Sequence, residues 1–274
     1  MLRSSNPILS KQDAFTPAAP QYGQNQFGRS PYQQYPPEAY GQPAPVQQAP
    51  EGPMTFDDVV TKTAVTLGVL AIAAGLAWML VPAALYFPTM VLSGLVGFVA
   101  VMVVSFRRVV NPGLVLAYAA IEGVFIGMIS KVFEMQFPGI VAQAVLGTFF
   151  AAGITLAAYK IFNIRVTPKF QKIVVLSTLA FAAMALVNFI FSLVTGQPGL
   201  RGGLTGEVSP LAYLISAVAI VLAVLNLVLD FDYIEKGVAM GAPARESWRG
   251  AFGLTVTMVW LYIEMLRLLS YLRR

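Results

Sequence analysis

The 274-residue sequence contains no cysteine and no histidine. Without cysteine there is no disulfide framework, no thiolate nucleophile and no cysteine-based metal site. Without histidine, the side chain that usually titrates near neutral pH is missing, and serine or zinc hydrolysis loses its usual base and ligand. Any sensing of pH must therefore use carboxylates, and we expect no enzyme activity and no cofactor.

Charge is also scarce, because only 11% of the residues are charged while 57% are apolar. A soluble domain has about a quarter charged and just under half apolar residues. The composition therefore predicts an integral membrane protein with the lipid bilayer as its surroundings. The formal net charge is +5. The basic residues stand beside apolar runs, where they set orientation and meet headgroups, so nucleic acid is not an expected partner.

The first 57 residues have a different composition from the rest of the chain. They hold ten of the eighteen prolines and nine glutamines, in pieces such as "PYQQYPPEAYGQ". Such a segment cannot bury enough apolar surface to offset its ordering entropy, so a disordered tail is predicted over residues 1–57. The first apolar run begins near Ala64, behind this polar segment, so a signal peptide is not expected. A docking role is the alternative to a solvated tail.

Seven apolar runs follow, each near the roughly 20 residues that a helix needs to cross the hydrocarbon core. Turn signals separate them, including Pro82, Asn111-Pro112 and "TGQPGLRGGLTGEVSP" at 195–210. Because helices satisfy their own backbone groups in lipid, we predict an all-α bundle of seven transmembrane helices in residues 58–274. The predicted spans are 60–81, 89–106, 112–130, 139–161, 172–194, 209–231 and 247–270.

Basic residues are distributed unevenly over the connections between the spans. The positive-inside rule places the side with more of them, which holds the N-terminus, in the cytoplasm of a cell membrane. The C-terminus would then be outside, although the closing "YLRR" would fit inside if the final helix were re-entrant. The N-terminal side carries Lys62, Arg107, Arg108, Lys160, Arg165, Lys169, Lys172, Lys236, Arg245 and Arg249, and the other side Lys131, Arg201, Arg273 and Arg274.

Ionisable residues inside membrane spans are costly and are therefore candidates for function. Glu122, in "AYAAIEGVFIG", lies near the middle of the third span, too far from either end to reach water easily. It must be protonated or have a partner, either for helix packing or on an ion or proton path. Gly123 and Gly127 lie one turn apart and would let a neighbouring helix approach closely.

The last two spans contain further acids. Glu264 has Arg267 three residues later on the same helical face, so a local ion pair is one interpretation. A second interpretation pairs Glu264 with Asp230, at the end of the sixth span. Asn226 shares a face with Asp230, whereas Asp232 points elsewhere. For Asp230 and Asp232 the simpler account is a helix end already in headgroup water.

The stretches "LDFDYIEKG" and "WLYIEMLRLLSYL" resemble the Bax inhibitor family (transmembrane Bax inhibitor motif proteins), over about residues 60–274. The resemblance implies a seven-helix bundle with the last helix central. For bacterial members it also implies a proton-sensitive calcium leak, controlled by carboxylates on helices six and seven. Carried over, these are Asp230 and Glu264, although the family usually has aspartate in helix seven. The family's gating arginine on helix two would be Arg107 or Arg108. The connection "EKGVAMGAPARES" is longer than is usual in the family.

Two carboxylates in a partly dry space cannot both ionise cheaply, so they share a proton and titrate as a coupled unit. When ionised they attract a divalent cation, and when protonated they draw the helices together. Calcium prefers six to eight oxygens, and Asp230, Glu264 and Asn226 supply fewer. The sequence therefore predicts a weak calcium site and a pH-sensitive cation leak, with calcium or protons passing.

Other functions of paired membrane acids fit the sequence less well than the leak. An intramembrane aspartyl protease would need a Gly-x-Gly-Asp environment, which is missing around Asp230. A proton-coupled transporter would be expected to show an inverted repeat, and none is visible. The stronger alternative is a non-conducting interaction protein that regulates membrane quality-control proteolysis or stress survival. Some bacterial members of the family are associated with membrane proteases, and the tail could make such a contact.

Overall fold

The computed structural model describes residues 52–197, 199–202 and 207–274, so most of the predicted disordered tail, residues 1–51, lies outside it. Seven helices in the described ranges are long and apolar enough to cross a membrane, and these ranges contain no strand. The predicted all-α, seven-span fold is therefore confirmed. The helices are α1 (Phe56–Leu80), α2 (Tyr86–Phe106), α3 (Pro112–Gln136), α4 (Ile140–Ile161), α5 (Pro168–Thr195), α6 (Pro210–Ala239) and α7 (Glu246–Leu272), with short 3-10 turns η1 (Ala83–Leu85) and η2 (Gly199–Arg201).

Three helices begin with the same local sequence device. In each, a capping side chain accepts a backbone N–H of the first turn, and a proline follows at the first helical position. Proline is tolerated there because its missing N–H would have no helical partner. The three dipeptides are Asn111-Pro112, Thr167-Pro168 and Ser209-Pro210.

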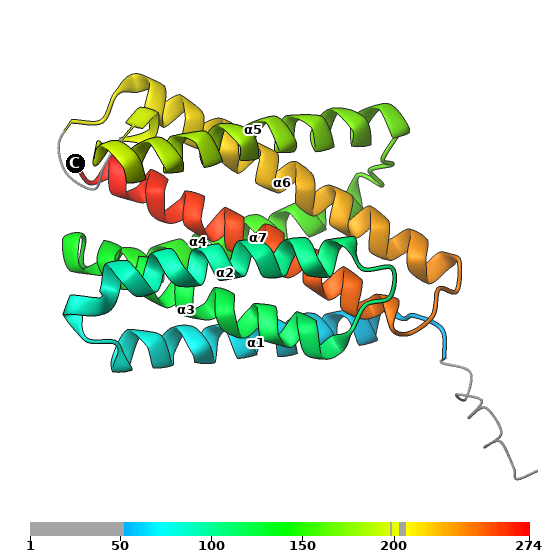
Figure 1. Ribbon diagram of the computed structural model, residues 1–274. Helices are drawn as coiled ribbons and strands as arrows, with labels where there is room; N and C mark the ends of the chain where they lie inside the picture. The colour runs from blue at the N-terminus through cyan, green and yellow to red at the C-terminus, as the bar shows by residue number, and fades with distance from the viewer. Residues whose placement is uncertain (1–51, 198, 203–206) are drawn as a thin grey trace, which may run out of the picture. The chain divides into compact units, whose positions relative to one another are not determined.

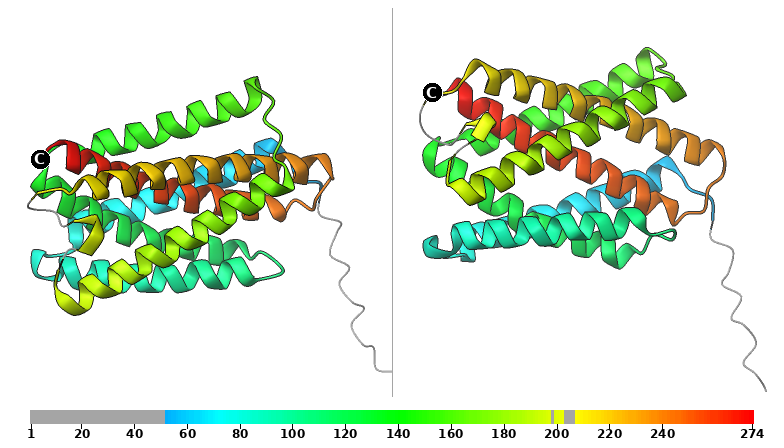
Figure 2. Two further views of the ribbon diagram at one scale, coloured as in Figure 1. Left: turned by 90° about the horizontal axis from the view of Figure 1, so that it is seen from above. Right: turned by 45° about the horizontal axis from the view of Figure 1, so that its top comes forward.

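The helices alternate in direction, as Figure 1 shows. We call the end of the bundle at which α1, α3, α5 and α7 begin end A, and the opposite end, where these helices finish, end B. Helix α7 runs from end A to end B and contacts α1, α3, α4 and α6. The two views of Figure 2 agree with this central position. Helix α7 is one continuous helix over this whole length.

Two helices lie at the periphery of the described bundle. Helix α2 packs on α3, and α5 packs on α6 and on η2. The backbones of α2 and α5 do not come close to each other or to α7, although the Phe181 ring of α5 stacks on the Trp260 ring of α7 at a centroid distance of 5.5 Å. This arrangement leaves a gap between α2 and α5 in which side chains from several helices meet.

Close packing of α1 on α3 depends on small residues. A Cβ atom on Gly123 would lie against the Leu70 carbonyl oxygen, and one on Gly127 against the Ala74 carbonyl oxygen. The backbones of the two helices are therefore nearly in contact, which only glycine permits at these positions. The predicted close approach of a neighbouring helix at Gly123 and Gly127 is observed, and α1 is that helix.

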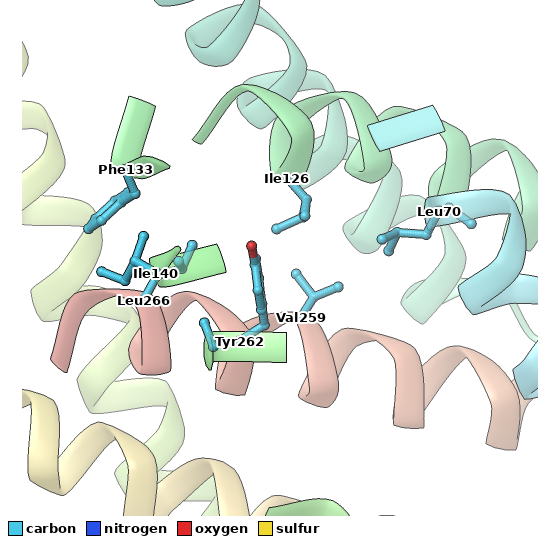
Figure 3. Packing of buried hydrophobic residues seen from close by; sticks show 9 residues of the cluster. Leu70, Ile126, Phe133, Ile140, Val259, Tyr262 and Leu266 are labelled. Atoms are coloured by element: carbon cyan, nitrogen blue, oxygen red, sulfur yellow. The ribbon is translucent and has the colours of Figure 1, made fainter. Parts of the chain in front are cut away.

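The largest apolar cluster surrounds α7 where it faces α1, α3 and α4 (Figure 3). Its labelled members point toward one another from four helices, and the hydroxyl of Tyr262 lies 2.6 Å from that of Ser130. A buried hydroxyl needs such a partner. The labelled residues are Leu70, Ile126, Phe133, Ile140, Val259, Tyr262 and Leu266.

Helix α6 is longer than predicted. The predicted span ends at residue 231, but the helix continues to Ala239, so most of the supposed long connection is helical or is the first turn of α7. Lys236 pairs with Asp232 at 2.6 Å with the i, i+4 spacing that supports an exposed helical turn. A run of apolar residues marks only the part of a helix that lipid covers. A polar continuation of the same helix cannot be recognised from such a run.

Residues 52–55, which the sequence assigned to the disordered tail, pack against the connection between α6 and α7. The Met54 N–H donates to the Ala242 carbonyl at 2.7 Å, and the Ala244 N–H donates to the Gly52 carbonyl at 2.8 Å. The Met54 side chain is buried, and it packs with Val59 and Ile234. The ordered region thus includes residues 52–57, and the predicted boundary at residue 57 was placed too late.

Candidate functional site

Asp230 lies inside α6 and faces α7. Its Oδ2 accepts a hydrogen bond of 2.7 Å from the Thr257 hydroxyl. On the same face of α7, a Cβ atom on Gly253 would lie 3.0 Å from Oδ1, so the two helices are close here. In the described ranges, no lysine or arginine forms an ion pair with Asp230. The carboxylate thus has a hydroxyl partner that donates a hydrogen bond without neutralising its charge.

The length of α6 decides where Asp230 lies along the bundle. Nine residues separate it from Ala239, the last residue of the helix, which is roughly 13 Å at the rise of an α-helix. Asp230 is therefore within the helix and not at its end, contrary to the simpler sequence-based account.

Glu264 belongs to a second site, nearer end B. It is 1% exposed, and the Nη2 of Arg201 donates to its Oε1 at 2.6 Å and also to its Oε2. Arg201 is itself buried, and its guanidinium lies 5.3 Å from the ring centroid of Phe181 on α5. The backbone carbonyl oxygen of Arg201 accepts a hydrogen bond from the hydroxyl of Tyr271, near the end of α7. The connection between α5 and α6 is therefore folded into end B of the bundle.

Glycine allows this inward turn of the connection. Gly199 and Gly202 flank the turn with φ angles of +61° and +68°, a region that favours glycine. Between them, the Leu200 N–H donates to the Asn188 side-chain oxygen at 2.8 Å. These contacts direct the Arg201 side chain toward α7.

The structure does not bring Asp230 and Glu264 together. The partner of Asp230 on α7 is Thr257, seven residues before Glu264, which corresponds to roughly 10 Å along the helix. The predicted proton-sharing pair is not formed because α6 crosses α7 at Thr257 and because Arg201 occupies both oxygens of Glu264. In the described ranges Glu264 forms an ion pair with Arg201 and none with Arg267, so the alternative local pair is not observed either.

The two acids also do not form a shared calcium site. In the described part of the chain there is no group of three or more acidic, histidine or cysteine side chains that could hold a metal ion. Any cation at Asp230 would find one carboxylate, the Thr257 hydroxyl and nearby carbonyl groups.

Glu122 is buried in the interface between α3 and α2. A Cβ atom on Gly97 of α2 would lie 2.7 Å from its Oε2, so the carboxyl group fills the space that this glycine leaves. Within the described ranges it forms no ion pair. The acid therefore sits at the α2 side of the bundle, separate from Asp230 on α6.

The other predicted site residues have local roles. Asn226 donates to the Thr178 hydroxyl of α5 at 2.7 Å and to the Leu222 carbonyl at 2.8 Å, and so links α5 to α6. Asp232 forms the ion pair with Lys236 described above. Neither residue joins Asp230 in a common cluster.

Arg107 and Arg108 follow α2 at end A and are exposed. Arg249 of α7 donates from Nη2 to their carbonyl oxygens, at 3.5 Å and 2.9 Å. In the described structure neither forms an ion pair with Asp230. The contact joins the α2–α3 connection to α7 through the backbone, so it depends on Arg249 rather than on the side chains of Arg107 and Arg108.

Sequence reasoning missed Arg201 and Thr257 as functional candidates. Arg201 is a basic residue in a glycine-rich connection on the side with few basic residues, which is a signal that it has a partner. Thr257 precedes Glu264 by seven residues and so lies on nearly the same helical face. Neither signal identifies the partner, because both pairings join different segments.

The seven spans and the acids around a central last helix define a polytopic α-helical membrane protein with buried ionisable groups. The sequence model of the family described as "Bax inhibitor 1 like" matches residues 6–274, nearly the whole chain. The protein therefore belongs to the Bax inhibitor 1 like family, as its resemblance indicated. A search of curated proteins returns no match.

Proposed function

We propose that this protein is a pH-sensitive cation leak, with calcium as the expected ion. One observation carries the proposal: Asp230 lies within a membrane helix with a hydroxyl partner and, in the described ranges, no basic partner. An ionised carboxylate in this position requires compensation, and a proton or a bound cation can supply it. Protons and cations therefore compete for the same side chain.

The arrangement around Asp230 favours passage over storage. Calcium prefers six to eight oxygen ligands, and Asp230 and Thr257 contribute far fewer. Binding is therefore weak, which lets an ion leave as readily as it enters. This part of the proposal replaces the shared site at Asp230 and Glu264 with a single carboxylate on α6.

The ion pair between Arg201 and Glu264 closes end B in this proposal. Both partners are buried, and separating them would leave two charges without compensation. An ion that passes Asp230 toward end B meets this pair, so the pair acts as a barrier to cations. By the positive-inside rule, end A faces the cytoplasm of a cell membrane and end B the opposite side.

Calcium entry into liposomes that contain the purified protein tests the leak. Uptake of calcium into vesicles with an internal indicator would be recorded from about pH 5 to about pH 8, a range in which a perturbed carboxylate can titrate. We expect uptake above that of empty liposomes, increasing with pH as Asp230 loses its proton. Uptake equal to that of empty liposomes at every pH contradicts the leak.

A non-conducting interaction protein is the second candidate. The observation that favours it is the anchoring of residues 52–55 on the α6–α7 connection, through Met54 and Ala242. A partner bound to residues 1–51, for example a membrane protease, would act directly on the helix that carries Asp230. Deletion of residues 1–51 separates the candidates, because it removes partner binding while leaving the ion flux of a leak intact.

A further inference from the structure

A cavity of about 800 Å³ lies between α1 and α4 and reaches end A. Its volume is within the range of roughly 300–1,000 Å³ that is typical of small-molecule sites. Helices α6 and α7 also line it, through residues such as Phe231 and Leu254. The backbones of α1 and α4 do not come close to each other in the described ranges. The cavity is therefore part of a groove along the side of the bundle, which we call the α1–α4 groove.

The groove opens toward the surface that lipid covers. Large apolar side chains from both helices line it and are at the same time exposed, and they are Phe56, Val60, Phe149 and Leu156. An apolar space that is open to the bilayer is filled by apolar groups, because close packing is favourable. Acyl chains are the apolar groups that a bilayer supplies.

The charged side chains of the groove are gathered at end A. Asp57 lies in the first turn of α1, Lys160 in the last turn of α4, and Glu235 near the end of α6. A second cavity of about 300 Å³ shares Leu67 and Phe149 with the first, continues toward end B and has no charged side chain in its lining. The groove thus has one polar end and a long apolar remainder, which is the pattern of an amphiphilic ligand.

These charged groups have no ionic partners of their own. In the described ranges none of Asp57, Lys160 and Glu235 forms an ion pair. The Lys160 ammonium lies 5.9 Å from the ring centroid of Phe56, and Glu235 accepts a hydrogen bond of 2.5 Å from the Tyr159 hydroxyl. All three charged residues are exposed, so a headgroup at the mouth of the groove can reach them.

The signs of these charges favour a headgroup that carries both charges. Lys160 can donate to a phosphate, and the carboxylates of Asp57 and Glu235 can accept from an ammonium group. A primary ammonium has three N–H donors for them, whereas a quaternary ammonium has none. Two carboxylates against one ammonium leave an excess of one negative charge, which disfavours an anionic headgroup.

The length of the cavity suits one lipid leaflet. Along α4 its lining extends from Lys160 at end A to Phe149, which is eleven residues or roughly 16 Å of helix. This is about half of the roughly 30 Å hydrocarbon thickness of a bilayer. A lipid with its headgroup at Lys160 therefore has its acyl chain alongside Leu156 and Phe149.

We propose that the α1–α4 groove binds a phospholipid with a primary ammonium group, of the phosphatidylethanolamine class. Its phosphate contacts Lys160, its ammonium contacts Asp57 and Glu235, and an acyl chain lies between α1 and α4. Phosphatidylcholine offers the same phosphate and chains but no N–H donor, and phosphatidylglycerol adds a negative charge without the ammonium. Both therefore bind more weakly.

Native mass spectrometry of the purified, delipidated protein tests this site. The probes are phosphatidylethanolamine, phosphatidylcholine and phosphatidylglycerol with the same acyl chains, and ethanolamine phosphate, which has the headgroup but no chain. We expect one tightly bound phosphatidylethanolamine, preferred over each of the other two lipids by about tenfold, as one charge-assisted hydrogen bond would supply. Ethanolamine phosphate should not be retained.

Matched variants separate the chain contact from the headgroup contact. Ala64→Trp fills the groove without changing its charges and should abolish tight binding, whereas Ile72→Trp, at a residue of the same helix that is 66% exposed and lines neither cavity, should not. The double change Asp57→Asn with Glu235→Gln should abolish the preference for phosphatidylethanolamine over phosphatidylcholine. Glu207→Gln, a charge change at end B, should retain that preference.

Equal binding of phosphatidylethanolamine and phosphatidylcholine by the wild type would overturn the proposal, and so would a preference for phosphatidylglycerol. Tight binding of phosphatidylethanolamine by Ala64→Trp would overturn it as well. The comparisons among lipids use the wild type and are independent of whether any variant folds. They are also independent of ion flux, so this site and the leak can fail separately.

Discussion

The side chain of Arg201 donates to both carboxylate oxygens of Glu264, although the two residues are 63 positions apart in the sequence. Arg201 comes from a short turn between α5 and α6, and Glu264 comes from the central helix α7. Because both side chains are buried, their charges are compensated mainly by each other. This pair fixes the connection at end B and leaves Asp230 as the acid between α6 and α7 without a basic partner in the described structure.

Removing one member of this pair should be far more harmful than removing both. Arg201→Met leaves Glu264 buried without its partner and should destabilise the protein by about 3–5 kcal/mol, whereas the double change Arg201→Met with Glu264→Met should recover most of that loss. Thermal unfolding of the purified protein in detergent measures the effect. Lys236→Met, which breaks the more exposed pair with Asp232, should change stability by no more than about 1 kcal/mol. A single Arg201→Met variant that melts with the wild type would show that the pair does not hold the connection.

Because α1 and α3 are in close contact, replacing a glycine by leucine should lower the stability at one position and not at another. Gly127→Leu places a side chain against the Ala74 carbonyl and should destabilise the bundle by about 1–3 kcal/mol. Gly153→Leu on α4 is the matched control, because a Cβ atom there would have nothing within 4 Å. Unfolding curves in detergent distinguish the two, and equal curves would mean that α1 can move away from α3 without cost.

The segment before α1 should protect the connection between α6 and α7. Met54→Ala removes a buried side chain that packs on Val59 and Ile234 and should cost about 2–5 kcal/mol locally. Limited proteolysis should then cut the connection at residues 240–245 faster than in the wild type. Deletion of residues 1–51, which retains Met54, should leave the rate of cleavage unchanged, and faster cleavage in that deletion would assign the protection to the tail instead.

Thr257 should tune the pH at which the proposed leak responds. Its hydroxyl donates to Asp230 at 2.7 Å, and a hydrogen bond to the ionised form of a carboxylate favours that form. Thr257→Val keeps the shape of the side chain but loses the donor, so Asp230 holds its proton to higher pH. The midpoint of calcium uptake against pH should therefore move to higher pH, while Thr255→Val, whose hydroxyl bonds to its own helix at the Ala251 carbonyl, should leave the midpoint in place.

The sequence was sufficient for the number of spans and for the close contact at Gly123 and Gly127. Hydrophobic length marks a membrane helix directly, and two glycines one turn apart mark a face that can accept another backbone. The resemblance to the family supplied the central position of α7. The end of α6 could not be obtained in this way, because its last turns leave the apolar region while remaining helical.

The pairing of the acids could not be predicted from the sequence. A single helix gives the depth and the face of Asp230 or Glu264, but not the point at which α6 crosses α7. That crossing placed Asp230 opposite Thr257, and the path of a glycine-rich connection brought Arg201 to Glu264. Both outcomes depend on contacts between segments that periodicity and composition do not relate.

In the proposed leak, Asp230 controls cation passage through its charge, and a matched pair of variants tests this role. Calcium uptake into liposomes would be measured from about pH 5 to about pH 8 for the wild type, for Asp230→Asn and for Asp232→Asn, which removes the same charge two residues away. We expect uptake that rises with pH in the wild type and in Asp232→Asn, and low uptake without pH dependence in Asp230→Asn. Uptake by Asp230→Asn that follows the wild type across the whole range would contradict it.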